Sequence, residues 1–219
     1  MGVTQVEAVP RRTRAYAGPS AAACVLVGAV SGLAWGAAFR AFMAEIAGGA
    51  SRFEWYGTFV AVLGAALITG ALLGLAEYVR RTGGWRHWRW LALAPLSFAI
   101  LPLTMPGALL ALFTQGLGGG AIAIAIVAIA GGFAVSGRGP LWGRIACGIL
   151  TLAVVGGAIA TVPAVGGIRL ALDQPRGVWV ATLAASCIAV LCLASSIPFR
   201  RVERPAEAST QPLEDGGAR

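Results

Sequence analysis

The sequence of 219 residues contains no lysine, a single histidine and few charges of either sign. Charged residues are 12% of the chain, whereas an ordinary soluble domain is about 25% charged. Hydrophobic residues are 58%, and the mean hydropathy is +0.78. This shortage of charge excludes a soluble enzyme, a disulfide scaffold and a nucleic-acid-binding domain, and it predicts a helical protein that crosses a membrane several times. The net charge of +8 is then expected to lie in loops at a membrane surface, with no nucleic acid as partner.

The sequence is also poor in groups that carry metal, redox or nucleophilic chemistry. His87 lies in the segment GGWRHWRW, which predicts an anchor at headgroup level and not a metal ligand. The four cysteines lie inside apolar stretches without a Cys-x-x-Cys pair, and they are predicted to be small buried residues: Cys24, Cys147, Cys187 and Cys192. We therefore expect no cofactor, no metal site and no catalytic centre.

Carboxylates are missing from the middle of every apolar stretch, where they would usually mark a proton or ion pathway. Glu77 comes closest, and Arg80 and Arg81 follow it by three and four residues. This spacing places all three side chains on one helix face and predicts a local ion pair. A proton-coupled carrier is therefore disfavoured.

Six apolar stretches are long enough to cross a hydrocarbon core of about 30 Å, which takes roughly 20 helical residues. They cover about residues 20–39, 55–79, 90–114, 117–135, 145–165 and 177–199. The predicted fold is all-α: a polytopic helical membrane bundle with six transmembrane helices. The polar tails at residues 1–18 and 201–219 have the composition of disordered segments. The first stretch is too long for the apolar region of a signal peptide, so we expect it to be a span.

The boundary between the third and fourth stretches has two solutions. Pro95, Pro102 and Pro106 interrupt the third stretch, so a turn near residues 102–106 is the alternative to one just before residue 117. The segment AIAIAIVAIA at 121–130 alternates only between small and large apolar residues. Because it has no polar face, it predicts a helix and not a strand.

Arginine predicts the orientation. A cytoplasmic N-terminus places twelve arginines inside and four outside, leaving aside Arg219. The inside group is Arg11, Arg12, Arg14, Arg80, Arg81, Arg86, Arg89, Arg138, Arg144, Arg200, Arg201 and Arg204, and the outside group is Arg40, Arg52, Arg169 and Arg176. The tryptophans are expected at the membrane boundaries, with Trp35, Trp55 and Trp179 outside and Trp85, Trp88, Trp90 and Trp142 inside. Both termini are therefore predicted to be cytoplasmic, in a plasma membrane.

Glycines recur at helical spacing in the first two spans. Gly28, Gly32 and Gly36 form two overlapping GxxxG steps, and Gly70 and Gly74 form a third. Such spacing makes a flat face that lets two backbones approach closely, which predicts a tight hairpin of the two spans. The alternative is a homodimer face.

Residues 40–58, in the first outer loop, concentrate charge and aromatic side chains. Their four charges define a candidate binding site, here called the outer-face patch: Arg40, Glu45, Arg52 and Glu54. We expect Arg40 and Glu54 to pair, and Arg169, Asp173 and Arg176 of the third outer loop to complete the patch. A structural account competes with this one: a capping box of Ser51 and Glu54, a snorkelling Arg40, and a short interfacial helix with Phe39, Phe42, Met43 and Ile46 on its apolar side.

The same loop carries a resemblance. The runs RAFMAEI and RFEWYGTF, followed by a glycine-rich span that ends at Arg80 and Arg81, resemble a group of small multi-pass membrane proteins from actinobacteria with a segment like RxWM…EFxWxGT in the first outer loop. Here Phe42 stands in place of the tryptophan, and Glu54 and Trp55 are adjacent. The resemblance implies a six-span fold in a plasma membrane, and it implies no activity.

The sequence thus favours a non-enzymatic structural, regulatory or assembly component of the membrane. The alternative is a transporter or channel for an uncharged or weakly polar solute, with a path past the prolines of the third span and past Thr104, Thr114 and Gln115. The lipid bilayer is the expected partner, together with a second copy or another membrane protein.

Overall fold

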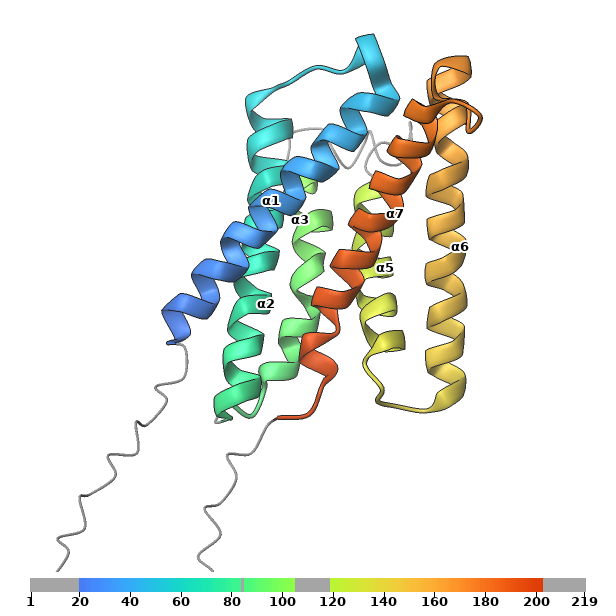
Figure 1. The fold of residues 1–219 in the computed structure, drawn as a ribbon. Coiled ribbons are helices and arrows are strands. Elements are labelled where there is room, and N and C mark those ends of the chain that lie inside the picture. The colour runs from blue at the N-terminus through green and yellow to red at the C-terminus, as the bar shows by residue number, and fades with distance from the viewer. Residues whose placement is uncertain (1–19, 84, 105–118, 203–219) are drawn as a thin grey trace, which may run out of the picture.

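The computed structural model describes residues 20–83, 85–104 and 119–202, and the regular secondary structure among them is helical, with no strand. Four helical segments are long and apolar enough to cross a membrane: Ala21–Ala50, Trp55–Thr82, Leu141–Leu170 and Pro175–Phe199. Two shorter apolar segments cover Trp88–Leu103 and Gly120–Val135. Figure 1 shows them packed side by side. The chain is therefore all-helical over these residues, as a helical membrane bundle requires, while most of both predicted tails lies outside them.

Helix α1 covers Ala21–Ala47 and is longer than the predicted first span. It begins after Ser20, whose Oγ accepts a hydrogen bond from the backbone nitrogen of Ala23 at 3.2 Å, and it ends at Gly48, where φ is +53°. The predicted separate interfacial helix is wrong, because Phe39, Phe42, Met43 and Ile46 all belong to α1. A 3-10 turn follows at Gly48–Ala50.

The second span begins as a π-helix at Trp55–Gly64 and continues as helix α2 at Ala65–Thr82. The glycine steps place α1 against α2. A methyl group built on Gly32 would collide with the carbonyl oxygen of Ala66, and one built on Gly70 would collide with that of Gly28. The predicted hairpin is confirmed, and the same contact shows that this glycine face is covered by the chain's own α2.

The next two elements are shorter. A 3-10 segment at Trp88–Leu96 leads into helix α3 at Ser97–Leu103, and each contains one of the prolines, Pro95 and Pro102. Helix α5 covers Gly119–Val135, so the prediction of a helix for 121–130 is confirmed. The predicted end of the third span, and with it the choice between the two turns, lies outside the described residues.

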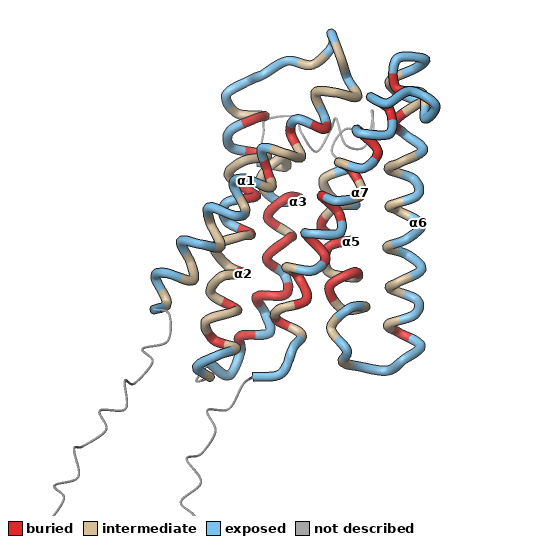
Figure 2. Tube along the Cα trace, viewed as in Figure 1, coloured by how far each residue is buried: buried red, intermediate tan, exposed pale blue. Residues whose placement is uncertain are grey.

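Helix α6 covers Leu141–Gly166 and is followed by a 3-10 turn at Gly167–Leu170. Helix α7 covers Pro175–Ser195, with a final 3-10 turn at Ile197–Phe199. Figure 2 shows α6 as mostly exposed, whereas buried positions gather on α2, α3, α5 and α7. The core therefore lies around α7, and α6 covers one side of the bundle.

Two of the predicted interfacial tryptophans lie inside the bundle instead. Trp35 donates from Nε1 to the carbonyl oxygen of Cys187 at 2.8 Å, and its ring centroid lies 5.2 Å from that of Phe98. Trp88 is buried against Ala76 and Val79. Proximity to the end of an apolar stretch suggested an interface, but Trp35 packs inward toward α3 and α7, and Trp88, at the start of the 3-10 segment, packs against α2.

The α1–α2 and α6–α7 connections lie at one end of the bundle (Figure 1). The α2–α3 and α5–α6 connections lie at the end where the chain leaves α7, and Arg138 Nη1 there donates to the carbonyl oxygen of Arg200 at 3.4 Å. We call this the arginine-rich end, because eight described arginines lie there beside the single described carboxylate Glu77: Arg80, Arg81, Arg86, Arg89, Arg138, Arg144, Arg200 and Arg201. The opposite end holds Arg40, Arg52, Arg169 and Arg176 with Glu45, Glu54 and Asp173.

Candidate functional site

Arg40 of the outer-face patch is buried, with 9% of its surface exposed. Its Nη2 donates to the carbonyl oxygen of Arg52 at 2.6 Å and to Ser51 Oγ at 3.3 Å, and its Nε donates to Thr58 Oγ1 at 3.5 Å. The guanidinium also lies 4.2 Å from the centroid of the Phe53 ring. Arg40 therefore does not snorkel outward; it ties α1 to the chain that enters the second span, through neutral oxygens and an aromatic face.

Glu45 has different partners. Its Oε2 accepts from Nη2 and Nε of Arg176 at 2.8 and 3.0 Å, and its carbonyl oxygen accepts from Nη2 of Arg169 at 2.9 Å. These contacts join the end of α1 to the α6–α7 connection, as expected for two of the three residues of the third outer loop. Asp173 is exposed, and within the described ranges it forms no hydrogen bond or ion pair.

The expected pair of Arg40 and Glu54 is absent from the described part of the chain. Arg52 and Glu54 are exposed there, and neither side chain has a hydrogen bond or ion pair with another described residue. The predicted capping box is also wrong. Ser51 Oγ accepts a hydrogen bond from Arg40, and the N-cap residue is Glu54, whose side chain makes no capping hydrogen bond. The four charges of the outer-face patch therefore fall into separate contacts and do not form one coupled cluster.

A larger feature lies between α1, α2 and α7, near the arginine-rich end. A hollow of about 430 Å³, here called the groove, has mostly apolar walls from these three helices and from Phe98 of α3. Its volume lies in the range of small-molecule sites, roughly 300–1,000 Å³. The glycines of the α1–α2 crossing line it, and Val27 of α1 and Val190 of α7, both exposed, stand at its rim.

The end of the groove nearer the bundle centre is closed by aromatic rings. Trp35 and Phe98 both line it, and their rings meet edge to face. The one nearby hydroxyl of α2, that of Thr69, is already satisfied: it donates to the carbonyl oxygen of Ala65 at 2.8 Å and bonds with Ser97 Oγ at 2.6 Å. This end of the groove therefore suits an apolar group.

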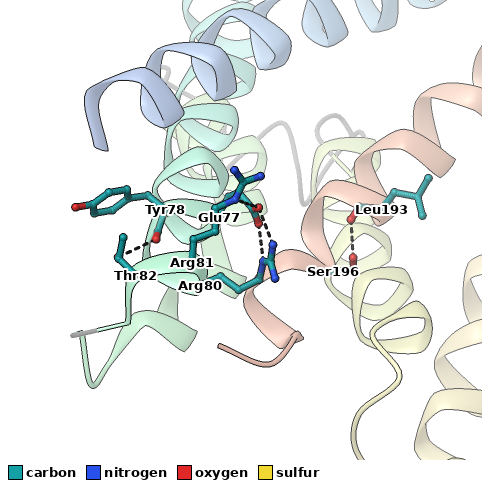
Figure 3. Close-up of polar contacts among 7 residues, drawn as sticks. All are labelled: Glu77, Tyr78, Arg80, Arg81, Thr82, Leu193 and Ser196. Atoms are coloured by element: carbon teal, nitrogen blue, oxygen red, sulfur yellow. Dashed lines mark hydrogen bonds and ion pairs between the residues drawn. The ribbon is translucent and has the colours of Figure 1, made fainter. Parts of the chain in front are cut away.

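The other end of the groove is charged. Glu77 and Arg81 line it, and the Glu77 carboxylate accepts from Arg81 Nε at 2.6 Å and from Arg80 Nε and Nη2 at 2.7 and 2.8 Å. Figure 3 shows these three side chains on the face of α2 turned toward α7, with Tyr78 and Thr82 on the other side. The predicted ion pair is confirmed. Among the described residues the cluster combines two cations with one anion, which gives these three side chains a net positive charge.

Other residues singled out from the sequence do not add to this site. Thr104 bonds with the hydroxyl of Tyr56 and donates to the carbonyl oxygen of Leu101 at 2.6 Å, while Thr114 and Gln115 lie outside the described residues. Cys187 and Cys192 are buried as predicted, but Cys147 and Cys24, which lines the groove, are only partly buried. In the part of the chain that the structure describes, no three His, Cys, Asp or Glu side chains cluster as metal ligands would.

The groove was not predicted from the sequence. Most of its wall residues are small or apolar, and such residues also occur along every other span, so no local pattern marks them. The only available signal was the placement of Glu77 and Arg81 beside a glycine-rich helix face. Comparisons of the chain with protein-family models, with curated proteins and with solved structures find no match.

Proposed function

We propose that this chain is a non-enzymatic membrane protein that holds a membrane lipid, with a hydrocarbon chain of the lipid in the groove between α1, α2 and α7. One observation carries the proposal: an apolar hollow of about 430 Å³ that is closed by aromatic rings at one end and flanked by a cationic cluster at the other. A lipid has the same division into apolar and polar parts.

Elementary energetics favour a hydrocarbon chain as the occupant. An unfilled apolar hollow forfeits dispersion contacts along its walls, and water there would find too few hydrogen-bonding partners. A bilayer surrounds its proteins with acyl chains, which make these contacts without loss of hydrogen bonds. The groove depth agrees: the eleven residue steps of α2 from Ala66 to Glu77 span about 16 Å, close to half of a hydrocarbon core of about 30 Å.

The proposal includes the placement of the chain in a plasma membrane. The arginine-rich end faces the cytoplasm, because basic loops are retained on that side, and both termini lie there as well. The two shorter helical segments, Trp88–Leu103 and Gly120–Val135, belong to the third and fourth of six spans. The charge difference between the two ends supports this orientation.

The proposal is tested by a substitution that fills the groove with a side chain. Ala194 of α7 lines it and is only partly buried, so Ala194→Phe places a ring where the acyl chain would lie. Ala160→Phe is the matched control, because Ala160 is exposed on α6, away from the groove. After purification in mild detergent, phospholipid retained per protein is measured by mass spectrometry.

We expect Ala194→Phe to retain at least about fivefold less lipid than wild type, which corresponds to about 1 kcal/mol of binding free energy. Ala160→Phe should retain as much lipid as wild type. Equal retention by Ala194→Phe and wild type, with both variants folded, would rule out the groove as a lipid site.

A further inference from the structure

We infer that the groove selects a phospholipid whose headgroup carries a net negative charge, and that Arg81 binds the headgroup phosphate. The inference rests on the proposed function and specifies the lipid class. It follows from how Arg81 is held, from the charge of its surroundings, and from the direction that the groove imposes on a lipid.

Arg81 is held in place but retains donors for a ligand. Its Nε donates to Glu77 Oε1 at 2.6 Å, which fixes the side chain at the groove. The side chain is 48% exposed, and no described residue accepts a hydrogen bond from its two terminal nitrogens. A guanidinium matches phosphate oxygens through paired N–H donors, so these terminal nitrogens suit a phosphate at the groove mouth.

The surroundings of Arg81 add positive charge. Glu77 is the single described carboxylate at the arginine-rich end, and it already accepts hydrogen bonds from both Arg80 and Arg81. Arg200 and Arg201 follow the groove residue Ile197 by three and four residues. A zwitterionic headgroup would bring its own cation into this field, whereas an anionic headgroup would not. Clustered arginines at a membrane surface therefore favour anionic lipids.

The groove also fixes the direction of the lipid. The aromatic end at Trp35 and Phe98 suits an apolar tail, with the Ser31 hydroxyl as a further polar group of the lining, and the charged end at Glu77 and Arg81 lies at the terminus of α2. A lipid whose tail fills the groove therefore presents its phosphate to Arg81 and not to the opposite end of the bundle.

The experiment measures lipid binding to the delipidated full-length protein by native mass spectrometry. Dioleoyl phosphatidylglycerol and dioleoyl phosphatidylcholine are the probes, because their acyl chains are identical and only the headgroup differs. Wild type is expected to bind the phosphatidylglycerol about fivefold more tightly or better. Arg81→Gln should lose most of this preference: its phosphatidylglycerol binding should fall more than its phosphatidylcholine binding, because both lipids lose the phosphate contact and only the anionic lipid also loses the attraction of its net charge.

Arg86→Gln is the matched control, because Arg86 lies at the same end and is exposed but does not line the groove. It should keep the preference for phosphatidylglycerol. A second variant changes the charge in the other direction: Glu77→Gln removes the anion of the cluster, so it should preserve or increase the preference. Inorganic phosphate at millimolar concentration should not displace the lipid, because it has no tail.

Equal binding of the two lipids to wild type would overturn the inference and leave the proposed function intact. An equal loss of preference in Arg81→Gln and Arg86→Gln would also overturn it, because the selectivity would then come from surface charge and not from the groove. Binding of neither lipid, or binding that Ala194→Phe does not reduce, would count against the proposed function itself.

Discussion

Arg40 and Arg81 are both arginines near the end of a long helix, yet their surroundings give them different tasks. Arg40 is buried, and its bonds go to Ser51, Thr58 and the carbonyl oxygen of Arg52. Arg81 is half exposed. Its Nε donates to the carboxylate of Glu77, and its other two nitrogens form no hydrogen bond with a described residue. A buried guanidinium with satisfied donors holds the fold together, whereas one with donors left over is available to a ligand.

The contacts of Arg40 predict which residues are coupled to it. Arg40→Gln leaves Ser51 and the carbonyl oxygen of Arg52 without their donor, so we expect a loss of about 1–3 kcal/mol in unfolding free energy. In double-mutant cycles read from thermal unfolding in detergent, Arg40→Gln and Ser51→Ala should be non-additive. Arg40→Gln and Glu54→Gln should be additive, because no bond joins the two side chains. The opposite pattern would restore the pairing of Arg40 with Glu54.

At the scale of the helices, the glycine spacing of α1 and α2 determines how closely they cross. Cβ atoms are missing where the backbones meet, at Gly28 and Gly32 on α1 and at Gly70 and Gly74 on α2. The crossing brings the first half of α1 against α2 and leaves the groove between α1 and α7. The glycine spacing therefore determines both the close contact of α1 with α2 and the position of the groove.

Substitution of one glycine tests this crossing. Gly32→Leu would place a side chain against the carbonyl of Ala66, so we expect overpacking to lower the unfolding free energy by about 1–3 kcal/mol or more. Gly157→Leu is the matched control on α6, since a Cβ there meets nothing within 4 Å. Thermal unfolding in detergent should show a loss for the first variant only. Equal melting of Gly32→Leu and wild type would contradict the close crossing.

These elements also show which features of the structure can be predicted from the sequence. The helices were predictable because long apolar runs have one outcome in a bilayer, and the hairpin because GxxxG spacing is a local pattern. The ion pair of Glu77 was predictable because its partners follow within one turn of helix. The groove was not, because it depends on how α1 lies against both α2 and α7, and the part of α1 that lines it, residues 23–35, has no charged side chain to mark one face. The pairing of Glu45 with Arg176 needs contact between connections far apart in the sequence.

At the scale of the whole molecule, the two ends differ in charge. Eight described arginines and one carboxylate lie at the arginine-rich end, and four arginines and three carboxylates lie at the other. At the second end Glu45 is paired with Arg176, and at the first Glu77 is paired with Arg80 and Arg81, so among the described residues the arginine-rich end keeps the larger excess of cations. This difference in charge supports both proposals: the cytoplasmic position of the arginine-rich end and the preference of the groove for an anionic lipid.

The orientation is tested by labelling from outside the cell. In a background with the four cysteines replaced by alanine, single cysteines are placed at Ala50 and at Arg86, which are exposed at opposite ends of the bundle. Ala50 is preferred to its neighbour Gly48, whose φ of +53° would strain a cysteine. An impermeant thiol reagent on intact cells should label Ala50→Cys and leave Arg86→Cys unlabelled until the membrane is opened.

Basic loops are retained in the cytoplasm during insertion, and this physical bias is the reason for the expectation. Labelling of Arg86→Cys alone would invert the molecule and place the lipid headgroup of the groove in the outer leaflet. Labelling of both before the membrane is opened would mean that the chain has no single orientation.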